Sequence, residues 1–183
     1  MDPENMNTES NEKYLLVGEK TERLCFRKFE QSDFSDWLPF YQDPRSTQYW
    51  EGLPQDPIEA CQEQFERLFE RYEKKLGGMN ALLHMTSGAL IGMAGLLIQT
   101  VDDIRELEIG YSLLPEYWKN GYATEAAKKC KQFAFENKLS NSLISIIHID
   151  NIPSRKVAGN NGMYLDKTTT YKDNPVHIFR IDA

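Results

Sequence analysis

The sequence predicts one domain of the α/β (α+β) class, with a mixed, mostly antiparallel sheet, one central parallel pair of strands, and flanking helices. Two apolar strand patterns are joined at residues 86–88 by Thr-Ser-Gly, which is typical of a hairpin, and a third strand follows the polar turn 101–103. An amphipathic helix over 121–137 separates that strand from the nearly continuous apolar run 143–149. A strand, a helix and a buried strand in this order indicate a right-handed parallel crossover.

The first part of the chain is predicted to supply one strand and two helices. Residues 22–29 alternate imperfectly between apolar and polar side chains, which predicts a strand. Ser32 can cap a helix that carries one apolar stripe, and Pro44 helps to close it. Asp56 and Pro57 mark a second helix, because they suit the cap and the first helical position, and its apolar face reaches residue 76.

The remaining elements follow the same signals. Strands are predicted at 80–85, 89–99 and 105–114, followed by the crossover helix and its strand, a short helix over 154–160, and a hairpin of strands 163–171 and 176–181. Gly92 and Gly95 lie inside a predicted strand, which indicates a bulge or a close approach of two backbones.

Length and composition suit a single domain with a core. The chain has 183 residues, of which 40% are hydrophobic and 27% are charged. Residues 1–15 are predicted as a flexible polar tail, and residues 16–183 as the domain. No stretch approaches the apolar length of a membrane span, and the N-terminus lacks the apolar segment of a signal peptide, so a cytoplasmic protein without a membrane partner is expected.

Charge and cysteine content argue against a nucleic-acid-binding protein, a disulfide framework and a zinc site. The formal net charge of −7 argues against a nucleic-acid partner, and it weakly favours cationic substrates such as amines. Cys25, Cys61 and Cys130 are widely spaced and odd in number, so they are expected to be reduced thiols and not disulfides or zinc ligands. No histidine has a partner at metal-ligand spacing, and no metal site is predicted.

The most informative segment is 106–127, where a strand passes through a short loop into a helix that starts near Gly121. Such a helix start offers free backbone N–H groups and the positive end of the helix dipole, and both suit a pyrophosphate. Gly121 allows close approach of the backbone, and Lys119 adds a positive charge. A glycine at a helix start is by itself more often an ordinary turn, and the segment lacks the pattern of a P-loop or a dinucleotide fold.

In this setting the segment Trp-Lys-Asn-Gly-Tyr-Ala at 118–123 resembles the Q/R-x-x-G-x-G/A acyl-CoA loop of the GNAT N-acetyltransferases. The wider segment 110–126 looks like the RimJ/RimL branch of that superfamily, which commonly has Trp at the first loop position. Three further segments are similar to that branch: Thr-Glu-Arg-Leu at 21–24, Ala-Leu-Ile-Gly at 89–92 and Asn-Ile-Pro-Ser at 151–154. The resemblance spans roughly residues 20–165 and implies the GNAT fold, in which the parallel pair of strands splays apart.

The resemblance implies an acetyl-CoA-dependent N-acetyltransferase. An acetyl group would pass by direct attack in a ternary complex to a primary amine, either a protein N-terminus or a small molecule. The strand around Ile109 would pair with the pantetheine amides, the loop would hold the pyrophosphate, and Asn151 and Ser154 would flank the pantetheine arm. The implied cofactor-binding residues are Ile109, Tyr111, Ser112, Leu113, Trp118, Lys119, Asn120, Gly121, Tyr122, Ala123, Thr124, Asn151 and Ser154.

Two carboxylates are candidates for the general base. Glu108 stands where the family often has its glutamate, just before Ile-Gly-Tyr, and Glu106 is the next candidate on the same strand face. A general acid is harder to find, because the position of the family's usual tyrosine holds Ala158. Ser154 and Tyr164 remain candidates for that role.

The acceptor side is expected to be lined by aromatic side chains of the first two helices and the segment between them. These residues are Trp37, Tyr41, Tyr49 and Trp50, with Phe65 as a further candidate. His148 is a minor candidate for the same groove. Residues 158–163 depart from the family's charged turn, which predicts a looser or reshaped junction under the acyl site.

Two alternatives stay open at this point. The chain can be a non-catalytic GNAT-like module that senses acyl-CoA or holds a partner, since fold alone does not give function. A homodimer is also possible, because the C-terminal hairpin leaves a strand edge for pairing.

Overall fold

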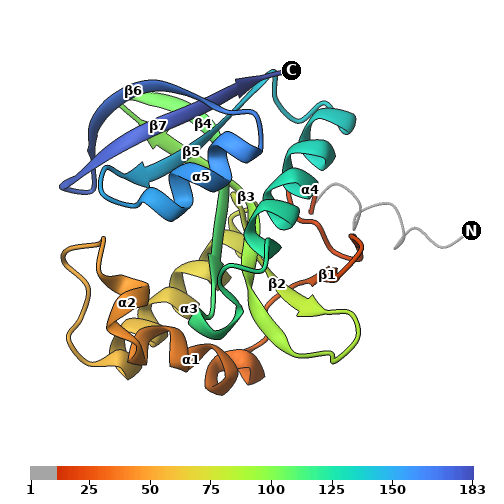
Figure 1. Ribbon diagram of the computed structural model, residues 1–183, viewed down its shortest axis with the longest axis vertical. Helices are drawn as coiled ribbons and strands as arrows, with labels where there is room; N and C mark the ends of the chain where they lie inside the picture. Colours follow the sequence, from red (N-terminus) through yellow and green to blue (C-terminus); the bar gives the residue numbers. More distant parts are fainter. Residues whose placement is uncertain (1–11) are drawn as a thin grey trace, which may run out of the picture.

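The computed structural model describes residues 12–183, which form a seven-stranded sheet with helices on both faces (Figure 1). The strand order is β1-β2-β3-β4-β5-β7-β6, and β4 and β5 are the parallel pair that the crossover predicts. The strands are β1 (Leu24–Arg27), β2 (Gly77–His84), β3 (Leu90–Val101), β4 (Ile104–Leu113), β5 (Ser142–His148), β6 (Tyr164–Tyr171) and β7 (Asn174–Asp182). The predicted fold class is confirmed.

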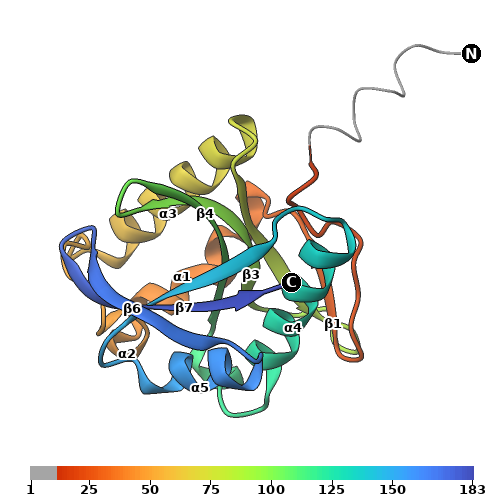
Figure 2. The ribbon, with the colours of Figure 1, turned by 90° about the horizontal axis from the view of Figure 1, so that it is seen from above.

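The helices cover both faces of the sheet. They are α1 (Phe34–Gln42), α2 (Pro44–Thr47), α3 (Pro57–Glu73), α4 (Tyr122–Glu136) and α5 (Ile152–Asn160), with short 3-10 turns η2 (Gln31–Asp33) and η3 (Pro115–Tyr117). Helices α1 and α3 pack on one face around Trp37 and Phe65. Helix α4 packs on the other through Ala126, Ala127 and Cys130, with α5 beside it, so the strands lie between α3 and α4 (Figure 2).

The helix starts show how local chemistry sets the boundaries. Asp56 caps α3 by accepting a hydrogen bond from the N–H of Ile58 (2.9 Å), and a proline takes the first helical position, as predicted. Helix α1 ends at Gln42, before Pro44, as predicted. Pro44 also begins the short helix α2, which the Asp43 side chain caps by accepting from the N–H of Arg45.

The glycines of β3 permit close backbone approach, as predicted. A Cβ at Gly95 would lie 2.0 Å from the carbonyl oxygen of Gly78, and one at Gly92 would lie 2.5 Å from that of Ser112. Neither distance leaves room for a side chain. The central strands consequently pack against their neighbours at these two positions only because the residues are glycines.

The parallel pair splays apart soon after it forms. β4 and β5 pair at Glu108 and Ile144, and one residue later the Ser145 hydroxyl, instead of a backbone group, donates to the carbonyl oxygen of Ile109 (2.8 Å). Beyond that point β5 is held by β7, and β4 is held by β3. One edge of β4 from residue 110 onward is thus free for a ligand.

The first described residues of the chain pack against the sheet. Residues 1–11 of the expected tail lie outside the described residues. Leu15 is buried, and Tyr14 packs against the same core cluster as Leu16. The N–H of Leu16 donates to the buried Asn80 side chain (3.1 Å), so the segment is fastened to β2 from about residue 14 onward.

Within residues 12–183, no helix is long and apolar enough to cross a lipid bilayer. In the same range, no group of three or more His, Cys, Asp or Glu side chains is placed to hold a metal ion. The three cysteines are free thiols, and burial raises the pKa of Cys61 to about 11.

Candidate active site

A groove of about 640 Å³ lies where β4 and β5 separate. One wall is formed by α5 and the end of β5, and the other by α2 and the segment that follows it; the two walls face each other in Figure 1. The start of α4 also lines the groove, as do Glu108, Met79 and Gln64. The groove therefore joins the predicted phosphate loop to the predicted base.

The start of α4 has the geometry of an anion site. Gly121 is the N-cap residue and has φ of +82°, the left-handed region that favours glycine, and Lys119 has φ of +62°. Within the described chain, no side chain caps this helix. The first N–H groups of α4, from Tyr122 to Thr124, are thus available where these residues line the groove.

Neighbouring side chains hold this loop in shape. The Asn120 side chain donates to the carbonyl oxygens of Tyr117 (3.2 Å) and Trp118 (3.0 Å), and the Trp118 indole donates to the carbonyl oxygen of Leu113 (2.9 Å). Asn120 differs from the expectation, because it braces the loop and is not among the groove-lining residues. A short amide that closes a turn cannot at the same time reach outward to a ligand.

Arg23 fastens the loop and α4 to the first strand. Its Nη1 donates to the carbonyl oxygen of Asn120 (2.9 Å), and its Nε donates to Glu125 in the first turn of α4 (2.7 Å). The guanidinium also lies 4.3 Å from the centre of the Tyr122 ring, within cation–π range. Glu125 additionally accepts from the Thr21 hydroxyl and the N–H of Arg23, and these bonds lower its pKa despite burial.

The groove carries a charge opposite to that of the chain. The groove-lining residues include three basic side chains, Arg45, Lys119 and Lys156, and, among the described residues, one carboxylate, Glu108. Arg45 lies 5.5 Å from the centre of the Trp118 ring and is held by Asp43. In a chain with a formal charge of −7, this local positive balance favours an anionic ligand.

Glu108 is mostly buried at the apex of the splay. Its carboxylate accepts from the Gln99 side chain (Nε2 to Oε2, 2.8 Å) and from the backbone N–H of Ile146. Burial is the largest influence and raises the pKa of Glu108, while the two donors act in the opposite direction. A carboxyl group with a raised pKa beside an open groove suits a general base.

Glu106 occupies a different environment, although it lies on the same strand. It forms an ion pair with Arg180 of β7 (2.6 Å), and both side chains are largely covered. It is not among the residues that line the groove. The structure therefore separates the two carboxylates that the sequence placed together.

The α5 side of the groove is ordered by capping bonds. The Asn151 side chain accepts from the N–H of Ser154 (3.1 Å), and the buried Tyr111 hydroxyl donates to the carbonyl oxygen of Ser154 (2.9 Å). Burial raises the pKa of Tyr111, so its hydroxyl keeps its proton. Both Asn151 and Ser154 line the groove, whereas Tyr164 lies on β6 and donates to Asp182.

The junction after α5 is anchored to α4. Ala158, at the position of the family's usual tyrosine, is fully buried. Asn161 is also buried: its side chain donates to the carbonyl oxygen of Ala127 (3.2 Å), and its own carbonyl oxygen accepts from Lys131 (2.8 Å). These bonds to α4 hold the turn that the sequence suggested could be loose.

Three of the four aromatic residues predicted for the acceptor side line the groove. Tyr41, Tyr49 and Trp50 line the groove, and His148 packs near Tyr49 and Trp50 (ring centroids 6.1 and 6.4 Å away). Trp37 does not line it. Its side chain is fully buried, and its indole N–H donates to Gln64 (2.6 Å), because this face of α1 packs on α3. Phe65 is buried in the same cluster.

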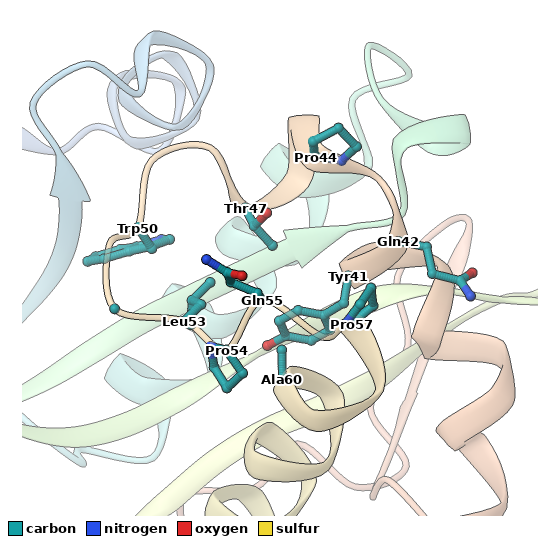
Figure 3. Close-up of a pocket in the computed structure, with 11 residues that line it drawn as sticks. Tyr41, Gln42, Pro44, Thr47, Trp50, Leu53, Pro54, Gln55, Pro57 and Ala60 are labelled. Atoms are coloured by element: carbon teal, nitrogen blue, oxygen red, sulfur yellow. The ribbon is translucent and has the colours of Figure 1, made fainter.

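A smaller cavity of about 330 Å³ adjoins this end of the groove. Tyr41, Thr47, Trp50 and Leu53 line both. Figure 3 shows the Tyr41 ring beside Pro57 and Ala60, with Trp50 on the opposite side and the Gln42 side chain turned away. The acceptor end is thus a branched space bounded by the loop between α2 and α3.

Sequence reasoning missed several residues that the structure brings to the site. Arg45 and Lys156 add charge to the groove, and Gln99 bonds the candidate base. The strand register contained a signal for Gln99, because it lies opposite Glu106 and hence diagonal to Glu108. No local pattern identifies Arg45 or Lys156 as groove residues.

The chain is similar to two Bacillus subtilis (strain 168) proteins. It is 26% identical over 170 residues to the protein YkkB, covering 92% of this chain and 96% of that protein. It is 24% identical over 138 residues to the N-acetyltransferase YoaA, covering 75% of this chain and 77% of that protein.

Solved structures share the fold, and the sequence matches a family. An acetyltransferase from Agrobacterium tumefaciens str. C58 has a TM-score of 0.76 at 24% identity, covering 90% of this chain and 94% of that one. RimL, a ribosomal L7/L12 alpha-N-protein acetyltransferase solved with coenzyme A, has a TM-score of 0.72 at 14% identity, covering 91% and 97%. The family model of the acetyltransferase (GNAT) domain matches residues 23–164. The chain therefore belongs to the GNAT acetyltransferase family, and it is an N-acetyltransferase, as the resemblance predicted.

Proposed function

We propose that this groove binds acetyl-CoA along the free edge of β4 and that Glu108 accepts the proton of a primary amine entering from the aromatic end. One observation carries the proposal: an uncapped helix start and a buried carboxylate lie in one continuous groove. The first suits the phosphates of the donor, and the second suits the amine.

Three features of the groove fit coenzyme A. The free N–H groups at the start of α4 suit a pyrophosphate, and Lys119, Arg45 and Lys156 supply positive charge around it. The edge of β4 beyond Glu108 is free of β5, so its backbone groups can pair with the pantetheine amides. Ser154 and Asn151 would flank the pantetheine arm from α5.

The chemistry requires one proton transfer on the acceptor side. The neutral amine nitrogen uses its lone pair to form a bond to the thioester carbonyl carbon, and it must then lose one proton, either directly or through a water molecule. Glu108 would take this proton; the carbon–sulfur bond then breaks, and the sulfur leaves as a thiolate. Ser154 is the remaining candidate near that sulfur, because Tyr164 lies outside the groove.

The acceptor would occupy the branched end lined by Tyr41, Tyr49 and Trp50. Donor and acceptor would enter from opposite ends of one groove, which suits direct attack in a ternary complex. A protein N-terminus and a small primary amine both fit this proposal, and the similarity to an enzyme named for its action on a ribosomal protein supports the former. A cytosolic location and pairing of two copies along β6 stay predictions.

Thermal unfolding with three ligands side by side tests the donor site. Acetyl-CoA and CoA at about 100 times Kd should raise the Tm by about 5 °C or more, while ATP should leave it nearly unchanged. Thiol release from acetyl-CoA in the presence of N-terminal peptides and small amines then measures turnover. Equal shifts with all three ligands, or none, would contradict the proposed donor site.

A further inference from the structure

The Glu108 carboxylate lies at the end of a hydrogen-bonded chain that starts outside the groove. Gln99 is on β3, opposite Glu106, so it is the diagonal neighbour of Glu108 on β4. Its Nε2 donates to Glu108 Oε2 at 2.8 Å. Gln99 is not among the groove-lining residues, so it reaches the base from behind.

The orientation of the Gln99 amide is fixed by two donors from other elements. Arg71 Nη2 on α3 donates to Gln99 Oε1 (2.8 Å), and the Tyr171 hydroxyl on β6 donates to the same oxygen (2.9 Å). A guanidinium has no acceptor atom, so the amide oxygen must face Arg71. The NH₂ group consequently faces Glu108, and the amide cannot flip without losing these bonds.

Arg71 is itself held in place. Its Nη1 donates to the carbonyl oxygens of Leu76 (3.2 Å) and Ile98 (3.0 Å), where α3 returns into β2 beside β3. The chain of bonds therefore joins α3, β3, β4 and β6 behind the site. Groups supported in this way hold a geometry more closely than a free side chain does.

The structure assigns Gln99 as a positioning residue that, held by Arg71 and Tyr171, aims the Glu108 carboxylate at the groove and favours its ionised form by donating a hydrogen bond to it. This inference rests on the proposed function, in which Glu108 accepts the proton. It adds that the base is tuned through a side chain that touches neither substrate.

The charged and titratable groups around Glu108 are consistent with this role. Burial raises the pKa of Glu108, while the Gln99 donor, the Ile146 N–H and the cations Arg71 and Lys172 lower it. Tyr111 and Tyr171 are also close, and burial raises the pKa of Tyr171 to about 12, so both are neutral near pH 7. Loss of the Gln99 donor should therefore raise the pKa of Glu108.

The pH dependence of kcat/KM tests the assignment. In Gln99→Met, which keeps length but removes the donor, the acidic limb should move up by about one pH unit. The rate should fall about tenfold below the wild-type midpoint and recover on the alkaline plateau. Tyr171→Phe should move the limb in the same direction by less, because Arg71 still holds the amide.

Two further variants separate the possible failures. Tyr164→Phe removes a hydroxyl on the same strand, β6, that bonds Asp182 away from the groove, and it should leave the profile unchanged. Glu108→Gln should abolish the acidic limb. If Glu108→Gln loses the acidic limb, but Gln99→Met and Tyr171→Phe both keep the wild-type midpoint of that limb, the positioning role of Gln99 is wrong. If Glu108→Gln itself keeps the limb, the proposed base is wrong. A uniform loss at every pH would also overturn the assignment, because it indicates a structural role alone.

Discussion

The two ends of the groove are built in different ways. At the proposed donor end, the groups that would face the ligand are backbone N–H groups and a strand edge from one continuous stretch, residues 108–124. At the proposed acceptor end, they are side chains from α1 and the loop after α2, and from β5, which follows about a hundred residues later in the chain. The donor end depends on local backbone conformation, and the acceptor end depends on how distant elements pack.

This difference explains what each end can tolerate. Backbone groups present the same atoms whatever the side chains are, so one phosphate site can persist while sequences diverge. Side chains such as Tyr41, Tyr49 and Trp50 change the shape of the space whenever they are substituted. The donor should therefore be common to the fold, and the acceptor should be particular to this chain. The predictions below test that division.

The largest effect is expected at Glu108, where the two ends meet. Glu108→Gln should lower kcat/KM by about 10²–10⁴-fold near neutral pH, because an amide cannot accept the proton of the amine. The Kd for CoA should stay within about twofold, since the donor phosphates lie at the other end of the groove. Steady-state kinetics and calorimetric titration with CoA measure the two effects.

The free energy of unfolding provides the control for Glu108→Gln. A carboxylate whose pKa is raised by burial destabilises the fold at neutral pH, so Glu108→Gln should unfold no more easily than wild type. Glu106→Gln breaks the ion pair with Arg180 and should cost stability with little change in CoA binding. Similar rates for Glu108→Gln and wild type would remove Glu108 from the mechanism.

The second prediction concerns the left-handed backbone at the donor end. Gly121→Ala should weaken CoA binding about tenfold, because a Cβ at φ of +82° strains the loop and would lie 3.4 Å from Nη2 of Arg23, the residue that fastens this loop. Gly88→Ala is the matched control: it has φ of +71°, lies in the β2–β3 turn, and has open space around it. Both should lose about 1 kcal/mol of stability, but Gly121→Ala alone should lose affinity. Equal affinities would show that this backbone does not hold the donor.

The third prediction concerns the clamp behind the donor loop. Glu125 accepts bonds from Thr21 and Arg23, so Glu125→Gln should lower the free energy of unfolding by about 1 kcal/mol at pH 7. The pKa of Glu125 is lowered in the folded protein, so its contribution is present above the unfolded value of about 4.3 and is lost as the pH falls through the lower folded value. The difference between wild type and variant should shrink below about pH 4.

Denaturant unfolding at several pH values measures this effect. Glu136→Gln, on the same helix with an exposed carboxylate that bonds Gln132, should change stability little. A difference between wild type and Glu125→Gln that stays constant down to pH 2 would contradict the assigned role of the ionised carboxylate.

The difference between local backbone at one end of the groove and distant side chains at the other also explains what could be predicted from the sequence. The loop at 118–124 and Glu108 could be predicted to lie near one another because strand, glycine and helix start follow one another along the chain, and both line the groove; their roles stay predictions. Trp37 was misplaced because an apolar stripe on α1 shows that a face is buried, not which neighbour covers it. Glu106 was grouped with Glu108 by strand alternation, and only the position of Arg180 on β7 separates them. Long-range packing supplied what the local pattern lacked.

The smallest effect should come from the charge of the donor end. Lys156 lines the groove, whereas Lys128 is exposed on the outer side of α4. Replacing either lysine with glutamine removes one positive charge, but only Lys156→Gln removes it from the groove. Lys156→Gln should weaken CoA binding about threefold at low salt and less at about 0.5 M salt, because ions screen an exposed charge. Lys128→Gln should change the affinity much less. If both variants weaken binding equally, the overall charge of the protein acts on the anionic ligand. If only Lys156→Gln does, the local cations of the groove offset the negative charge of the rest of the chain.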